Sequence, residues 1–141
     1  MFQTMSNAAT AYTKIGRDMG VETANPHKLV LMLYDGALLA LGLAISHLDA
    51  GDKRAMSDEI VRATNIISQG LRDSIDAKAG GDLAERLAAL YDYMGVRLQF
   101  ANIKADKKII EEVSGLLRDL REAWEEIAKD PAVVSDGRKV A

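Results

Sequence analysis

The 141-residue sequence contains no cysteine, only two prolines and few aromatic residues (5%). Without cysteine the chain can form no disulfide and use no thiol chemistry, and a cytosolic location fits this composition. The scarcity of proline, beside many Ala, Leu, Glu and Arg residues, favours helix over sheet. A net charge of −3 argues against the basic face that nucleic-acid binding requires. The start of the chain has no basic region followed by an apolar run, so we expect no secretory signal.

The sequence also lacks the motifs of common catalytic and metal sites. His27 and His47 would lie about 30 Å apart on one helix, too far to share a metal. No phosphate-binding loop of the form GxGxxG or GxxxxGK[ST] occurs, and no nucleophile motif surrounds a Ser or Thr. A phosphotransfer bundle would need an exposed mid-helix histidine with a lysine nearby. His47 is close to a helix end and has no such lysine. We therefore expect no enzyme, no cofactor and no metal.

Four long amphipathic helices are predicted, joined by short connections. The first spans 26–50, with Pro26 at its first position and Gly51 as the left-handed residue after its end. The second spans 53–75, the third begins with Asp82 as its cap after two glycines, and the fourth begins at Asp106. Short connections make neighbouring helices antiparallel. The sequence thus predicts an all-α, antiparallel up-down four-helix bundle over residues 26–128.

Each helix carries an apolar stripe that we expect to build the core, with Tyr34, Tyr91 and Trp124 beside it. The stripes are Val30, Leu33, Ala37, Leu41, Ala44 and Leu48; Met56, Ile60, Ala63, Ile67, Leu71 and Ser74; Leu83, Leu87, Leu90, Met94, Leu98 and Ala101; and Ile109, Val113, Leu116, Leu120, Ala123, Trp124 and Ile127. Outside the bundle we expect an N-terminal arm (1–25) and a flexible tail (129–141). Tyr12, Ile15 and Met19 give the arm a short helix with an apolar edge.

The first helix carries a second apolar stripe on nearly the opposite side, formed by Met32, Gly36, Leu39 and Leu43. A surface helix needs only one such stripe, so something must cover the second. Gly36 in mid-helix costs roughly 1 kcal/mol relative to Ala, which indicates that another backbone approaches it. The helix is not expected to insert into a membrane, because polar residues and glycines interrupt the apolar run. The third helix has a lesser second stripe: Ala89, Tyr93, Val96 and Phe100.

Particular residues carry a resemblance to a known family. The matching segments are Val21–Leu29 (VETANPHKL), Leu31–Ala37 (LMLYDGA), Leu90–Met94 (LYDYM) and Leu120–Trp124 (LREAW), in register over about residues 8–128. Together they resemble the flagellin-export chaperones of the FliS family. Asn25 stands where the family more often has Ser, and either residue can cap a helix.

The resemblance implies a cytoplasmic chaperone of flagellar type III secretion that binds the C-terminal segment of flagellin. It would prevent premature polymerisation and deliver flagellin to a component of the export gate. We expect the binding residues on the second stripe of the first helix: Met32, Asp35, Gly36, Leu39 and Leu43. The short helix of the N-terminal arm could act as a displaceable lid over this site. Contacts with the client or with this lid are expected from Tyr12, Ile15, Met19, Tyr93, Val96 and Phe100. The alternative is a structural bundle without a client, which would use its second stripes to form a homodimer.

Overall fold

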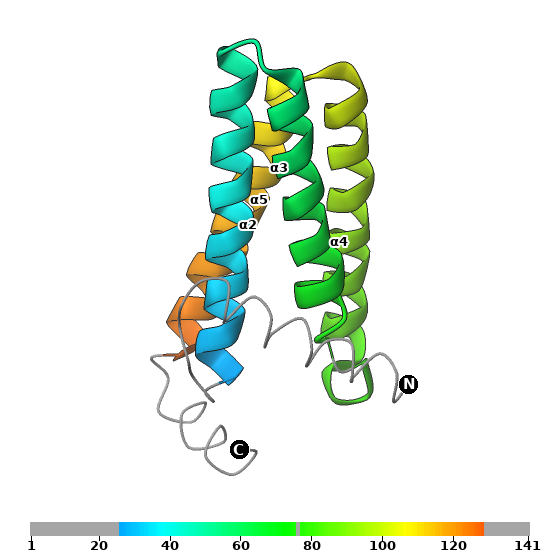
Figure 1. The fold of residues 1–141 in the computed structure, drawn as a ribbon. Coiled ribbons are helices and arrows are strands. Elements are labelled where there is room, and N and C mark those ends of the chain that lie inside the picture. Colours follow the sequence, from blue (N-terminus) through cyan, green and yellow to red (C-terminus); the bar gives the residue numbers. More distant parts are fainter. Residues whose placement is uncertain (1–25, 76, 129–141) are drawn as a thin grey trace.

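The computed structural model describes residues 26–75 and 77–128, and the elements in this part of the chain are all helical. They are α2 (Pro26–Asp49), α3 (Lys53–Asn65), the π-helix η1 (Ile66–Arg72), α4 (Ala77–Lys104) and α5 (Lys107–Ala128). Because η1 continues α3, four rods lie side by side, as Figure 1 shows. The predicted all-α bundle is confirmed. The expected N-terminal helix with Tyr12, Ile15 and Met19 and the expected tail lie outside the described residues.

The turns between helices follow the expected chemistry. Gly51 has φ 78°, and the Asp52 carboxylate accepts a hydrogen bond of 3.0 Å from the Ala55 amide at the start of α3. Asp106 caps α5 in the same way through the Lys108 amide, at 3.0 Å. Gly81 adopts φ 54° inside α4, so the regular part of that helix begins at Asp82, as predicted.

The second predicted helix is not uniform, because it changes from α3 to a π-helix at Ile66. Ile66, Ile67, Gly70 and Leu71 are all buried in η1. Gly70 lies directly against Leu33 of α2, and a Cβ atom on Gly70 would be 2.9 Å from Leu33 Cδ2. Ile67 and Leu71 lie in the core, as the α-helical stripe predicted, so the apolar spacing did not reveal the change to a π-helix.

Helix α2 contributes the largest share of the core and contacts α3, η1 and α5. Leu33, Ala37, Leu41 and Ala44 are buried, as the first stripe predicted, and Tyr34 and Ala40 join them. By length and composition alone α2 is also the one helix among the described residues that could cross a bilayer. Its packing against three other segments accounts for the buried part of this apolar character.

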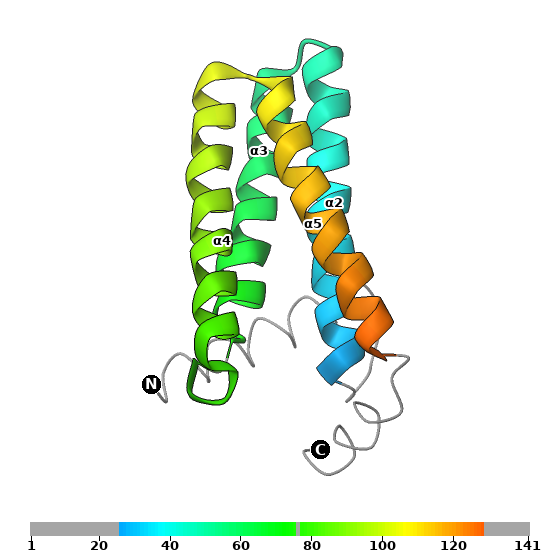
Figure 2. The same ribbon diagram turned by 180° about the vertical axis from the view of Figure 1, so that it is seen from behind.

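Helix α5 crosses the bundle at an angle. Figure 2 shows it beside α4 at its yellow start and beside the blue start of α2 at its orange end, so that α4 and α5 separate there. We call this the diverging end. It explains three wrong core assignments: Leu83 is 66% exposed, and Ala123 and Ile127 are also exposed. The buried face of α5 is instead centred on Ile110, Val113 and Leu117, of which only Val113 was predicted.

Candidate binding surface

The second stripe of α2 divides into a covered half and an exposed half. Met32 is half-buried, and a Cβ atom on Gly36 would lie 3.4 Å from Ile66 Cδ1, so the neighbour of Gly36 is a side chain of η1. Leu39 is 58% exposed, and Leu43, one turn further on, is also exposed. We call Leu39 and Leu43 the α2 patch. Two large apolar side chains at i and i+4 offer one continuous contact surface.

Asp35 contacts α5 rather than solvent alone. Both of its carboxylate oxygens accept hydrogen bonds from the Arg121 guanidinium, and the Nη2–Oδ2 distance is 3.4 Å. Arg121 also donates to Glu125 at 2.7 Å. The bond with Asp35 raises the pKa of Arg121 above its ordinary value. Asp35 therefore fixes the tilted helix α5 to α2, a role that the sequence pattern did not indicate.

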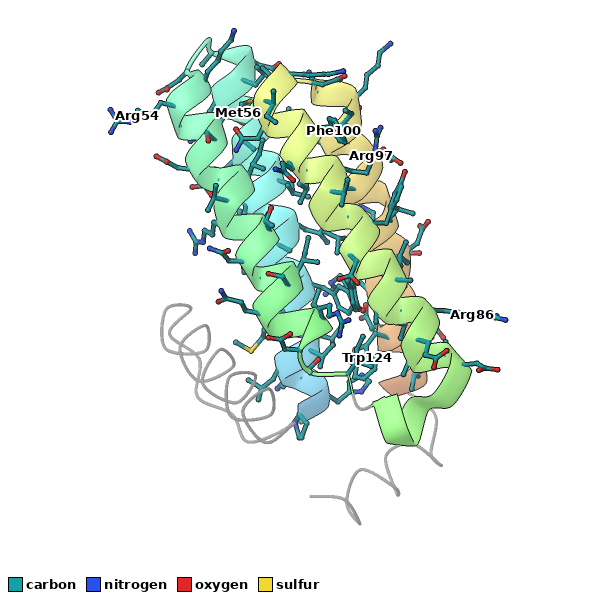
Figure 3. All side chains as sticks on the ribbon, turned by 90° about the vertical axis from the view of Figure 1, so that its right-hand side faces the viewer. Arg54, Met56, Arg86, Arg97, Phe100 and Trp124 are labelled. Atoms are coloured by element: carbon teal, nitrogen blue, oxygen red, sulfur yellow. The ribbon has the colours of Figure 1, made fainter. Side chains whose placement is uncertain are left out.

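A longer apolar surface runs along α4. The expected residues Tyr93, Val96 and Phe100 are exposed, Ala89 precedes them, and Ile103 continues the row with 74% of its surface exposed. We call these five residues the α4 stripe. Figure 3 shows Phe100 and Arg97 on the half of α4 nearest α5's start, with Arg86 further toward the other end. Ile103 was missed because the expected stripe was stopped at Phe100, although the i+3 spacing continues.

One edge of the α4 stripe is held to α5 by Glu112. Its carboxylate accepts a hydrogen bond of 2.5 Å from the Tyr93 hydroxyl and one of 2.9 Å from Arg97 Nε. These two bonds lower the pKa of Glu112, and the bond to Glu112 raises the pKa of Tyr93. We call these three residues the Glu112 clasp. The clasp holds the Tyr93 hydroxyl against α5, while Tyr93 as a whole stays exposed.

Polar and aromatic contacts bridge the helices toward the diverging end. The hydroxyls of Tyr34 and Tyr91 are buried and 2.6 Å apart, joining α2 to α4. The Trp124 ring stacks on His27 with 4.5 Å between centroids, and its Nε1 donates to the His27 carbonyl at 3.0 Å. Trp124 is thus half-buried at the edge of the core, against which it packs, and it is tied to the start of α2 (Figure 3). Leu87, Leu90 and Leu120 nearby are half-buried as well.

The described residues offer apolar surfaces and no group of three His, Asp or Glu side chains able to hold a metal ion. The α2 patch and the α4 stripe lie on two helices that make few direct contacts with each other. Such surfaces can bind an apolar or amphipathic protein segment.

Comparison with known proteins gives one consistent family. The family model described as flagellar protein FliS matches residues 7–131. A flagellar secretion chaperone FliS of Salmonella typhimurium is 43% identical over 118 residues, which cover 84% of this chain and 87% of that protein. The protein of the same name from Escherichia coli is 37% identical over 126 residues, which cover 89% of this chain and 93% of that protein. The one from Bacillus subtilis is 36% identical over 122 residues, which cover 86% of each. The resemblance inferred from the sequence is confirmed: this chain belongs to the FliS family of flagellar proteins.

Proposed function

We propose that this protein is a cytoplasmic flagellar secretion chaperone that binds the C-terminal segment of flagellin. In this role it prevents premature polymerisation and hands flagellin to a component of the export gate. The names of the relatives support the chaperone class, and the resemblance supplies flagellin as the client. The observation that carries the proposal is the exposed α2 patch on a helix whose other face already builds the core.

The α2 patch suits an amphipathic client segment. Leu39 and Leu43 would contact its apolar side, while the half-buried Met32 can change rotamer to fit it. Gly36 lies between Met32 and Leu39 along this stripe. Asp35 lies beside the stripe and accepts a hydrogen bond from Arg121. A segment that is disordered in free flagellin would become ordered on this surface, which permits both wide contact and later release.

We further propose that the N-terminal arm acts as a lid over the client site. Tyr12, Ile15 and Met19 would use their apolar edge to compete with the client for the same surface. Deleting residues 1–20 should then strengthen client binding, because the competitor is gone. If the arm is instead part of the site, the same deletion should weaken binding.

Paired substitutions on α2 test the client site. Leu39→Glu should keep its helical circular dichroism and weaken binding of the flagellin C-terminal segment at least tenfold, about 1.4 kcal/mol. Leu41→Glu, two residues along, should unfold the domain, since Leu41 is fully buried and the new charge would have no partner. Both effects are read by calorimetric titration and by circular dichroism.

Val61→Glu provides a matched control for the Leu39 variant. Val61 is similarly exposed (48%) but lies on α3, about 140° around the helix from Ile66, which packs on α2. It should bind the client like the unmodified protein. Normal binding by Leu39→Glu would show that the α2 patch is not the client site.

A further inference from the structure

The two turns at the top of Figure 1 lie at the same end of the bundle, one between α2 and α3 (50–52) and one between α4 and α5 (105–106). We call this the closed end. The Lys107 ammonium lies 3.2 Å from Asp49 Oδ2, and this ion pair joins the two turns. Exposed cationic side chains are concentrated at the helix ends beside these turns: Lys53, Arg54, Lys104, Lys107 and Lys108. They outnumber the three carboxylates Asp49, Asp52 and Asp106, so the closed end is positive on a chain of net charge −3.

The diverging end carries the opposite charge. In the second half of α5 four carboxylates outnumber two arginines. At the start of α4, Asp82 and Glu85 outnumber Arg86, and Lys28 of α2 does not reverse the balance. The described part of the chain is therefore an electrostatic dipole along the bundle axis. An anionic surface would attract the closed end, repel the diverging end and so bind the molecule in one orientation.

Two large apolar side chains lie beside the cations of the closed end. Ile103 is the most exposed large apolar side chain among the described residues, and Phe100, about one turn earlier, is exposed as well. The Lys104 ammonium lies 5.9 Å from the Phe100 ring centroid. Figure 3 shows Phe100 and Arg54 on the halves of their helices nearest the closed end. Apolar side chains bordered by lysines are typical of peripheral membrane binding, which combines apolar burial with attraction to anionic lipids.

We propose that the closed end docks on an anionic lipid surface. The lysine ammonium groups would lie among the lipid phosphates, while Ile103 and Phe100 enter the headgroup region and no helix crosses the bilayer. A lipid surface fits this end better than an acidic protein does, because it accepts a protruding aliphatic side chain without a shaped pocket. It also attracts lysines as point charges, without the paired geometry that arginine provides. The proposal does not depend on flagellin as the client.

Sedimentation of the full-length protein with vesicles tests the docking. Vesicles of phosphatidylcholine and phosphatidylglycerol in equal parts should carry the protein down, whereas vesicles of phosphatidylcholine alone should not. Binding should fall at least tenfold between about 0.01 M and about 0.15 M ionic strength, because salt screens the attraction.

Paired charge reversals show which end binds. At about 0.1 M ionic strength, where charges act over about 10 Å, Lys104→Glu combined with Lys108→Glu should weaken vesicle binding at least tenfold. Arg62→Glu combined with Arg86→Glu makes the same change in net charge at exposed positions outside the closed end. This control should lower binding less than twofold. Circular dichroism should show that both variants are folded.

Site-specific labelling tests the orientation, because the chain has no cysteine of its own. Ile103→Cys carrying an environment-sensitive dye should emit at shorter wavelengths on the phosphatidylglycerol vesicles. Leu83→Cys carries the same dye at a similarly exposed position of the diverging end and should keep its emission. Equal shifts at the two positions would overturn the proposed orientation.

Three other outcomes would overturn the proposal. The protein could fail to bind the anionic vesicles at low ionic strength, or the two charge-reversal pairs could weaken binding equally, so that total charge alone would account for it. The protein could also bind polyglutamate and not the vesicles, which would assign the closed end to an acidic protein surface. Failure of the client proposal is a separate result, since it is read from flagellin titration of the Leu39→Glu variant without vesicles.

Discussion

Glu112 links the stability of the fold to pH through its two hydrogen bonds to α4. Its bonds from Tyr93 and then Arg97 lower its pKa, so the folded state binds its proton less readily than the unfolded chain. The clasp therefore stabilises the fold fully above the ordinary glutamate pKa of about 4.3. This contribution is lost as the pH falls through the lowered pKa. On the alkaline side, the bond to Glu112 raises the pKa of Tyr93. The contribution of Tyr93 to stability is therefore complete below the ordinary tyrosine pKa, and it is lost as the pH rises through the raised pKa.

We predict that Glu112→Gln lowers the melting temperature at neutral pH and that this difference shrinks in acid. Below about pH 4 the unmodified protein should lose stability more steeply than the variant, because only its clasp is titrated. Thermal melts followed by circular dichroism between about pH 3 and pH 8 measure the difference. Asp119→Asn, an exposed position on α5, serves as the control and should follow the unmodified protein. A pH-independent difference for Glu112→Gln would count against the clasp.

At the scale of the element, η1 is where the structure departs most from the sequence pattern. Helix number, the turn at Gly51 and the cap at Asp106 were predictable, because local chemistry determines each of them. The π-helix was not, since buried residues at 66, 67, 70 and 71 also fit an α-helical stripe. Only Gly70 hints at it: a glycine inside a helix often marks a close approach, and here Leu33 fills the space.

We predict that Gly70→Ala destabilises the bundle by about 1–3 kcal/mol, because the added methyl group overlaps Leu33 in a packed core. Gly42→Ala is the matched control on α2. A Cβ atom there would meet nothing within 4 Å, so replacing this helical glycine should stabilise the protein by about 1 kcal/mol. Urea unfolding of both variants gives the two values. Stabilisation by Gly70→Ala as well would rule out the tight contact between η1 and α2.

At the scale of the whole molecule, the tilt of α5 divides the bundle into a closed end and a diverging end. Periodicity along one helix cannot predict the tilt, because it depends on contacts between elements: Asp35 with Arg121, and His27 with Trp124. For the same reason the sequence placed Leu83 and Ile127 in the core. The α2 patch and the α4 stripe were predictable as surplus apolar stripes, but which of their residues the bundle itself covers was not.

We predict a gradient of mutational cost along the bundle. Leu98→Ala, in the fully buried part of α4, should cost about 4 kcal/mol. Leu90→Ala and Leu120→Ala remove half-buried side chains toward the diverging end and should cost about 2 kcal/mol each. Urea unfolding measures all three. Equal costs at the three positions would mean that the two ends are packed alike, and losses below about 1 kcal/mol at both Leu90 and Leu120 would remove them from the core.

The stacking of Trp124 on His27 has an optical consequence. Trp124 is the only tryptophan of the chain, so the intrinsic fluorescence of the whole protein comes mainly from one indole at the diverging end. Its half-buried ring has both an apolar face and a hydrogen-bonded N–H, so its emission depends on how much water reaches it. A client segment that packs against the Trp124 ring would exclude water from it and shift the emission to shorter wavelengths. A guest bound only at Leu39 and Leu43 would leave the spectrum unchanged, which makes the unlabelled protein its own reporter of where a segment binds.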